Sequence, residues 1–358
     1  MSERENSGLK NAKASKNDEF YTQLHDIQRE LNAYIEYDAN VFRDKTVLLP
    51  CDDPEWSNFT RIFAQRFNAW GLKKLISTSY ANERKKYVYK PMVDLFDIET
   101  DSEQFDASKT NTRGKIYTLD RSDGEVHDLF HLHWRYLDGD GDFRSEEVTR
   151  LRDEADVIIT NPPFSLFREF LKWIVDADKK FLIIGNINCI TYKEVFPLIK
   201  ENKIWLGTGM GRAISGFIVP NEYELYGTEA RIDERGNRII STNNGLWLTN
   251  LEHGRRHEPL ILMTMAKNIK HSRHKEIKGI GYAKYDNYDA LEVPYCDAIP
   301  DDYDGVMGVP ITFLDKYNPE QFEIVGDSRY HDGQNFPDDI NVVNGKKLYR
   351  RILIRRRR

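Results

Sequence analysis

The sequence predicts an α/β fold built on an open, mostly parallel sheet. Short apolar runs alternate along the chain with segments whose apolar residues recur at helical spacing, the order expected of a sheet flanked by helices. The runs are apolar at successive positions, as strands covered on both faces require. A chain of 358 residues, 40% hydrophobic and 31% charged, can form a large core and about two domains.

The first predicted elements lie between residues 18 and 77. Apolar side chains at helical spacing predict an amphipathic helix over 18–37. The run 45–50 predicts a buried strand. Residues 54–70 predict a second helix that ends at Gly71, since glycine is a favourable residue just beyond a helix C-terminus. Residues 72–77 predict the next strand.

The same alternation returns further along the chain. Residues 155–160 predict a strand, 165–175 a helix and 180–186 another strand. Residues 83–150 are charged and less regular. From about residue 206 to 326 the helical periodicity fades while Gly, Asn, Asp and Tyr become frequent, which predicts a β-rich or loop-rich module.

Composition excludes several classes of protein. The longest apolar runs, 181–190 and 259–266, are far shorter than the ~20 residues of a membrane span, and the N-terminus lacks the apolar stretch of a signal peptide. Cys51, Cys189 and Cys296 form no CxxC pair, which argues against a disulfide framework or a zinc site. We therefore expect no membrane contact and a reducing, cytoplasmic compartment.

Charge is distributed in blocks. The net charge is −6, yet residues 255–278 hold seven Lys or Arg against two Glu, and residues 341–358 hold eight with no acid. Residues 285–304 hold seven acids and no Lys or Arg. Such separation suits an anionic partner held on one face of the protein. A solvated surface with a frayed arginine end is the alternative.

The tetrapeptide Asn161-Pro162-Pro163-Phe164 carries the predicted chemistry. It follows the strand 155–160 directly, and ligands of open α/β sheets bind outside the carboxyl ends of the strands. An exocyclic amino group becomes nucleophilic when acceptors meet both of its N–H bonds. Asn161 offers a side-chain oxygen, and Pro162 offers a carbonyl held between two φ-restricted residues. Phe164 offers a face on which an extruded base stacks.

This arrangement predicts in-line transfer of a methyl group from a sulfonium donor to the amino nitrogen. Neither a cysteine nucleophile nor a metal is needed. A turn that merely ends a strand is the alternative interpretation of the tetrapeptide.

The sequence resembles the amino-methyltransferases that use S-adenosylmethionine, and more closely the EcoRI-type adenine-specific DNA methyltransferases. The resemblance covers most of the chain in order. It is carried by SKNDEFYTQ at 15–23, VLLPCDDPEWSNF at 47–59, GLKKLI at 71–76, GDFRSEE at 141–147, ADVIITNPPFSLF at 155–167, LWLTNLEHGRR at 246–256, and KYDNYDALEV and PITFLDKYNPEQFEIVG toward the C-terminus.

The resemblance implies a Rossmann-like class I methyltransferase fold with a seven-stranded sheet and a C-terminal target-recognition region. We accordingly divide the chain into a flexible arm at 1–17, a catalytic domain at 18–268, a recognition region at 269–340 and a basic tail at 341–358. Residues 207–245 are expected to form a DNA-facing insertion in the catalytic domain. Double-stranded DNA is the implied binding partner, and a separate restriction endonuclease is the implied functional partner.

The resemblance also implies which residues bind the donor, S-adenosylmethionine. They are Phe20, Tyr21, Thr22, Pro50, Asp52, Asp53, Asn58, Asp142 and Phe143. The first three form an FYT element beside the methionine part of the donor. The next four belong to the loop after the first strand, and the last two lie where the donor's adenine ring is held.

Two departures from the family pattern concern this donor site. Related loops are glycine-rich so that the backbone can approach the ligand, whereas PCDDPEWSN contains no glycine. No acid follows the strand 72–77 to bind the ribose hydroxyls, and Asp52 or Asp53 is the available substitute.

The basic block at 255–278 is expected to contact DNA phosphates. The expected contacts are Arg255, Arg256, Lys267, Lys270 and Arg273. For Arg255 and Arg256, a solvated turn is the alternative.

Other motifs suggest chemistry that we do not favour. Pro50-Cys51 is similar to the dipeptide of cytosine-C5 methyltransferases but does not follow the catalytic strand, so we expect a small buried cysteine. Residues 207–211 suggest a phosphate loop, although we prefer a flexible turn near the target site. Residues 138–142 begin like a calcium loop but lack the needed Gly and Glu. The histidine pairs at 131/133 and 253/257 lack a third ligand, so no metal is expected.

The expected function is site-specific methylation of adenine N6 in duplex DNA, with the target base flipped out of the helix. The enzyme would serve a restriction-modification system or act as an orphan or phage methylase. Methylation of an RNA base or of protein glutamine N5 is one alternative. A catalytically silent DNA-binding relative is another, since the donor loop lacks glycine.

Overall fold

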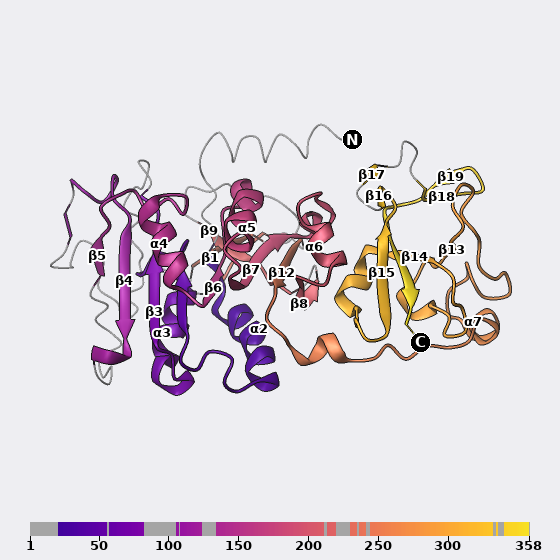
Figure 1. Ribbon diagram of the computed structural model, residues 1–358, viewed down its shortest axis with the longest axis horizontal. Helices are drawn as coiled ribbons and strands as arrows, with labels where there is room; N and C mark the ends of the chain where they lie inside the picture. Colours follow the sequence, from indigo (N-terminus) through magenta and orange to yellow (C-terminus); the bar gives the residue numbers. More distant parts are fainter. Residues whose placement is uncertain are drawn as a thin grey trace. The chain divides into compact units, whose positions relative to one another are not determined.

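The computed structural model describes residues 21–55, 57–81, 105–106, 108–123, 134–210, 213–219, 230–234, 236–240, 244–331, 334–335 and 340–357 (Figure 1). The arm predicted at 1–17, the donor residue Phe20 and the histidine pair at 131/133 lie outside these residues.

The chain divides into two compact units. Unit 1 comprises Met1–Glu194 and Leu206–Leu251, and unit 2 comprises Val195–Trp205 and Glu252–Arg358. We expected the recognition region to begin at residue 269. Unit 2 also includes residues 252–268, which we had placed in the catalytic domain. These residues bond to later parts of unit 2, since Arg255 bonds to Asp315 and the Leu260 backbone bonds to the Gln321 side chain.

A sheet of eight strands organises unit 1, in the order β5-β4-β3-β2-β6-β7-β12-β8 (Figure 1). Strand β2 pairs parallel with β3 and β6, and β6 pairs parallel with β7. Strands β4 and β12 are antiparallel to β3 and β7, and β5 is antiparallel to β4. The strands are β2 (Thr46–Leu49), β3 (Lys74–Thr78), β4 (Lys115–Asp120), β5 (Trp134–Tyr136), β6 (Val157–Thr160), β7 (Lys180–Asn186), β8 (Trp205–Met210) and β12 (Gly245–Thr249).

The α/β class is confirmed, but the predicted sheet of seven mostly parallel strands is not, because the sheet has eight strands of mixed direction. Charged residues concealed β4, because Lys115 opens it and Asp120 ends it. Lys115 is nevertheless 1% exposed. Its charge is neutralised by partners described below, so a residue that looked like a surface position belongs to the core.

Helices α2 (Leu24–Tyr37), α3 (Asn58–Trp70), α4 (Glu146–Glu154) and α5 (Phe167–Val175) accompany this sheet. Helix α3 ends as predicted, since Gly71 adopts a left-handed conformation with φ 63°. Helix α2 begins at Leu24 rather than at residue 18. The preceding Tyr21–Thr22 forms strand β1, because it finds a pairing partner in β9.

Strand β1 belongs to a second, four-stranded sheet of unit 1. The order is β1-β9-β11-β10, with β9 at Phe217–Val219, β10 at Arg231–Ile232 and β11 at Arg238–Ile240. The antiparallel register pairs Thr22 with Phe217. Two segments almost 200 residues apart in the sequence are thereby joined beside the main sheet.

Aromatic side chains fill the core of unit 1. Trp247 of β12 meets Phe59 of α3 edge to face, with ring centroids 6.0 Å apart. Phe63 packs at 5.4 Å from Phe42 and 5.2 Å from Trp70. Edge-to-face pairs of this kind hold rings in defined orientations, so α3 is fixed against the core along most of its length.

Unit 2 is built around the sheet β13-β14-β20-β15. Its strands are β13 (Leu291–Glu292), β14 (Met307–Pro310), β15 (Phe322–Asp327) and β20 (Arg351–Arg356). The predicted basic tail is wrong for 351–356, because these residues form a strand paired on both sides. Ile352, Leu353 and Ile354 are fully buried, and Arg351 bonds to Glu292 at 2.7 Å, which neutralises its charge.

The remaining elements are short. They are α6 (Phe196–Lys200), α7 (Met265–His271), the hairpin pairs β16–β17 (Tyr330–His331, Gln334–Asn335) and β18–β19 (Val342–Val343, Lys346–Lys347), and the 3-10 helices η2 (Arg121–Asp123), η3 (Phe164–Leu166), η4 (Ile187–Thr191), η5 (Gly254–His257), η6 (Cys296–Ala298) and η7 (Ile311–Lys316). Within the described residues, no helix has the length and apolar character that crossing a membrane requires.

Candidate active site

The order of the main sheet changes direction at the carboxyl ends of β2 and β6. From β2 the chain continues to β3 on one side, whereas β6 and β7 lie on the other, which makes β2–β6 a topological switch point. The Thr160 hydroxyl at the end of β6 donates a 2.6 Å hydrogen bond to the carboxylate of Asp52, three residues beyond the end of β2. The predicted donor loop and the predicted catalytic tetrapeptide therefore leave the sheet side by side.

Asp52 is the central residue where these two segments meet. Its carboxylate also accepts a 2.6 Å bond from the Ser57 hydroxyl, and its backbone carbonyl accepts one from Ser77 at 2.6 Å. Burial raises the pKa of Asp52 to about 7, although the hydrogen bonds from Ser57 and Thr160 oppose this shift. Its charge is therefore sensitive near neutral pH to any cation that binds beside it.

A buried lysine fixes the remainder of the donor loop. Lys115 Nζ lies 2.5 Å from Glu55 Oε2 and 3.7 Å from Asp53 Oδ2, and Glu55 also accepts a 3.0 Å bond from the Trp134 indole. The ammonium group lies 4.8 Å from the centre of the Trp134 ring, a cation–π distance. Side-chain bonds thus shape a loop that contains no glycine.

Sequence reasoning missed Lys115, Trp134, Ser57 and Thr160 as parts of this site. The only local signal was a lysine at the start of the otherwise apolar run KIYTL, which hinted at a buried charge. Partners from four separate segments of the chain complete the arrangement, and their proximity depends on the fold.

Glycines are required near Asp142 instead of in the donor loop. A Cβ on Gly141, whose φ is +80°, would lie 2.1 Å from the Ser79 carbonyl oxygen, and one on Gly114 would lie 2.4 Å from the same atom. No side chain fits there without moving backbone. This close packing places the loop that bears Asp142 against the end of β3.

The two predicted adenine-site residues differ in their surroundings. Asp142 is partly exposed, and its bonds from Arg144 hold the pKa of its carboxyl below the usual value. The Phe143 ring packs edge-on against Phe170 at 5.0 Å and Trp173 at 5.6 Å, so this side chain is a core residue. A donor contact at position 143 would involve mainly the backbone.

The catalytic tetrapeptide leads from β6 into η3. Pro162 is buried, and Asn161, Pro163 and Phe164 are partly exposed. The Phe164 ring meets Phe217 of β9 edge to face, with centroids 5.9 Å apart and an interplanar angle of 75°. The tetrapeptide thus contacts the second sheet as well as the donor loop.

Strand β1 brings Tyr21 and Thr22 of the predicted FYT element close to the tetrapeptide's partner Phe217. Thr22 pairs with Phe217, and its carbonyl accepts a 2.8 Å bond from the Asn58 side chain at the start of α3. Thr22 Oγ1 is buried and has no hydrogen-bond partner among the described residues. A buried hydroxyl without a partner is costly, and a bound polar ligand would satisfy it.

The predicted DNA contacts all lie in unit 2. Lys267 and Lys270 are exposed on α7, and Arg273 is 81% exposed with Asp297 at 2.8 Å. Arg255 is partly exposed and pairs with Asp315 at 2.7 Å. These four residues remain predicted phosphate contacts.

Arg256 corrects one of these predictions. It is 5% exposed, its guanidinium lies 3.6 Å from the centre of the Trp205 ring, and it bonds to Asn202. Burial lowers its pKa, and Glu252 at 3.4 Å compensates part of the cost. Arg256 therefore holds η5 within unit 2 and is not presented to a phosphate.

The remaining motifs have structural roles. Cys51 is partly exposed, so the expectation of a buried cysteine is not met, although desolvation raises the pKa of its thiol. Gly207 belongs to strand β8, so the flexible turn predicted at 207–211 is wrong for its described part. His257 lies 3.1 Å from Glu252 and 3.2 Å from Glu320. In the described ranges, no group of three or more His, Cys, Asp or Glu residues is placed to hold a metal.

Comparison with known proteins identifies the family. The model of the family described as "Adenine-specific methyltransferase EcoRI" matches residues 8–357. The chain is 48% identical over 353 residues to Type II methyltransferase M.EcoRI of Escherichia coli, covering 99% of this chain and 97% of that protein. It is 31% identical over 364 residues to Type II methyltransferase M.MpnI of Mycoplasma pneumoniae, with 97% of each chain covered.

A third relative is Type II methyltransferase M.MgeORF184P of Mycoplasma genitalium, 32% identical over 358 residues, which cover 96% of this chain and 97% of that protein. No solved structure matches the chain. The predicted family and the predicted enzyme class are confirmed. This chain belongs to the EcoRI family of adenine-specific methyltransferases and is an enzyme that uses a methyl donor.

Proposed function

We propose that the enzyme transfers a methyl group from S-adenosylmethionine to N6 of an adenine flipped out of double-stranded DNA. The hydrogen bond between Thr160 and Asp52 is the observation that carries this proposal, because it joins the donor loop to the catalytic tetrapeptide. Recognition of one DNA sequence, as in a type II restriction-modification system, follows from the likeness to M.EcoRI and M.MpnI.

The residues around Asp52 fit this donor. S-adenosylmethionine supplies, when bound, an electrophilic methyl group on a positively charged sulfur. Asp52 and Asp53 in the loop and Asp142 near it provide three carboxyl groups, and an ionised carboxylate there favours a bound cation. Tyr21 and Thr22 belong to the FYT element, which is expected to lie beside the methionine part, and the Thr22 hydroxyl has no partner in the part of the chain that the structure describes. Pro50 and Asn58 bound the loop.

The tetrapeptide handles the acceptor. The Asn161 side-chain oxygen and the Pro162 carbonyl accept the two N–H bonds of the adenine amino group and stabilise the positive charge that develops on nitrogen. The bound donor would supply the methyl carbon to the nitrogen lone pair, the electrons of the broken carbon–sulfur bond would stay on sulfur, and one amino proton would pass to water. Pro163 restricts the backbone, while Phe164 stacks on the flipped base.

Unit 2 supplies the DNA contacts in this proposal. Lys267 and Lys270 lie on the exposed side of α7, with Arg273 directly after the helix. Exposed cations of this kind neutralise phosphates and release counterions. Arg255 contributes in the same way when its ion pair with Asp315 breaks and its guanidinium binds a phosphate instead. The recognition region, the cytoplasmic location and a paired endonuclease belong to the same proposal.

Expression in a host without adenine methylation tests the function. The genomic DNA of cells that express the wild-type chain should carry N6-methyladenine at one sequence, read by single-molecule sequencing, and that of cells with Asn161→Ala should carry none. If the purified protein binds S-adenosylmethionine but labels only RNA or protein with a radioactive methyl group, the proposed substrate is wrong. If it binds no donor, the catalytically silent alternative is correct.

A further inference from the structure

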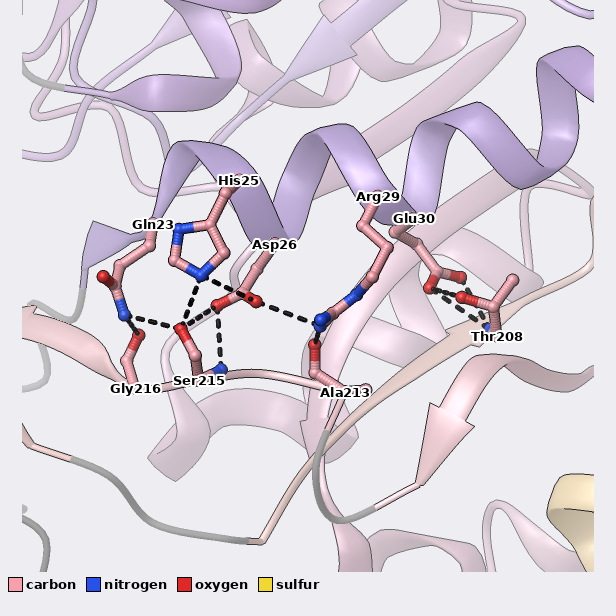
Figure 2. Close-up of polar contacts among 9 residues, drawn as sticks. All are labelled: Gln23, His25, Asp26, Arg29, Glu30, Thr208, Ala213, Ser215 and Gly216. Atoms are coloured by element: carbon pink, nitrogen blue, oxygen red, sulfur yellow. Dashed lines mark hydrogen bonds and ion pairs between the residues drawn. The ribbon is translucent and has the colours of Figure 1, made fainter.

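Polar contacts join the start of α2 to residues 208 and 213–216, none of which the proposed chemistry uses (Figure 2). Gln23, just before α2, and Asp26 and Arg29 on α2 point toward residues 213–216, which precede β9. Gln23 donates to the Ser215 hydroxyl at 2.8 Å and to the Gly216 carbonyl at 2.9 Å. The helix thus holds the chain immediately before Phe217.

Asp26 makes the central contact. Its Oδ2 atom accepts hydrogen bonds from both the backbone N–H and the hydroxyl of Ser215, each 2.8 Å long. Its Oδ1 atom accepts a 3.0 Å hydrogen bond from Arg29 and lies 3.3 Å from His25 Nε2. Arg29 also donates a hydrogen bond to the Ala213 carbonyl. Asp26 is fully buried. A buried carboxylate with this many donors holds its partners in one geometry.

The geometry of residue 216 transmits this constraint to the candidate active site. Gly216 has a φ of +140°, and a Cβ there would lie 2.7 Å from Ile239 Cγ2 and 2.8 Å from the Ile240 carbonyl oxygen. The chain therefore turns in a confined space and delivers Phe217, fully buried, against Phe164. Few alternative positions of Phe217 are compatible with Ser215 bound to Asp26.

We propose that Asp26 is a positioning residue for methyl transfer, which acts through Ser215 and Phe217 on the orientation of Phe164. This inference rests on the proposed stacking of the target adenine on Phe164. Asp26 itself touches neither substrate. Its effect should appear in the rate of the chemical step, because misplacement of a stacked base alters the alignment of its amino group.

Glu30 provides a matched control on the same helix. It is also a buried carboxylate, one turn further along α2, and it accepts bonds from the Thr208 backbone N–H at 3.0 Å and the Thr208 hydroxyl at 2.5 Å (Figure 2). Tyr34 donates a third bond to it at 2.9 Å. Its partners lie in β8 and on α2 itself, so Glu30 stabilises the same region without holding residues 215–217.

The experiment compares Asp26→Ala, Asp26→Asn and Glu30→Ala. Single-turnover methyl transfer is measured with saturating donor and target duplex, together with the Kd of each ligand and the melting temperature. Asp26→Ala should slow transfer on the order of tenfold to a hundredfold, with both Kd values within about threefold. Asp26→Asn, which keeps one acceptor oxygen, should recover part of the rate. Glu30→Ala should lower the melting temperature while transfer stays near the wild-type rate.

Equal rate losses in Asp26→Ala and Glu30→Ala would show a purely structural role and overturn the inference, as would an unchanged rate in Asp26→Ala. Phe164→Ala separates this inference from the proposed function. If Phe164→Ala slows transfer but Asp26→Ala does not, only the positioning role fails. If Phe164→Ala leaves the rate unchanged, the stacking on which both depend is wrong.

Discussion

Removal of the Thr160 hydroxyl tests the electrostatics of the donor site. Burial raises the pKa of Asp52 to about 7, and the Ser57 and Thr160 hydroxyls hold it from rising further. The proposed donor is a cation, so the ionised carboxylate should bind it more tightly than the neutral acid. We therefore expect donor affinity in the wild-type enzyme to increase with pH through about 7.

The size of the effect follows from the structure. One unit below its pKa, a carboxyl is ionised in about one molecule of ten, which corresponds to a loss of ~1.4 kcal/mol in binding that requires the charge. Thr160→Val keeps the shape of the side chain but removes a 2.6 Å bond to the carboxylate. A hydrogen bond to a charged group contributes ~1.5–3 kcal/mol, or about one to two pKa units. The midpoint of the affinity profile should move upward by that amount.

Isothermal titration calorimetry of S-adenosylmethionine across the neutral pH range measures this profile in wild type and Thr160→Val. Asp52→Asn serves as the control, because the donor's own ionisations persist in it while that of residue 52 is abolished. A steep profile in Asp52→Asn, or the same midpoint in Thr160→Val as in wild type, would refute the assignment of Asp52 to the donor cation.

Four further outcomes are expected. Asn161→Ala should lower kcat without weakening donor or DNA binding more than a few-fold, and single-turnover rates near wild type would contradict its role. The free energy of unfolding of the free enzyme should fall as pH rises from about 4 to 7. The raised pKa of Asp52 means that the folded state binds more protons than the unfolded state in this range. Urea titrations of Asp52→Asn should lack this pH-dependent component. Replacing Lys267 and Lys270 by Ala should flatten the log–log salt dependence of DNA binding by roughly two, and an unchanged slope would place the DNA contacts elsewhere. Arg256→Ala should cost ~2 kcal/mol of unfolding free energy with the salt slope unchanged, whereas a flatter slope would restore Arg256 as a phosphate contact.

Local patterns in the sequence determined the parallel centre of the main sheet. The runs at β2, β3, β6 and β7 are short and mainly apolar, which is typical of strands covered on both faces. Gly71 ended α3 where expected, since the left-handed conformation there excludes most other residues. The tetrapeptide after β6 was recognisable because its chemistry depends on four adjacent residues.

Tertiary pairing decided the elements that local patterns concealed. Tyr21–Thr22 continued a helical pattern but pairs with β9, and the arginine-rich 351–356 became a buried strand because Glu292 neutralises Arg351. A charge is tolerated in a core only when its partner is present, and the partner is set by the fold.

The same reason limited the prediction of the site. The sequence placed the donor loop and the tetrapeptide directly after two strands. It could not show that Thr160 bonds to Asp52, that Lys115 forms an ion pair with Glu55, or that Arg256 stacks on Trp205. Each of these contacts joins residues about 50 or more positions apart. Periodicity and local propensity report on neighbours within one element, whereas such distances are settled only when strand order and helix packing bring the segments together.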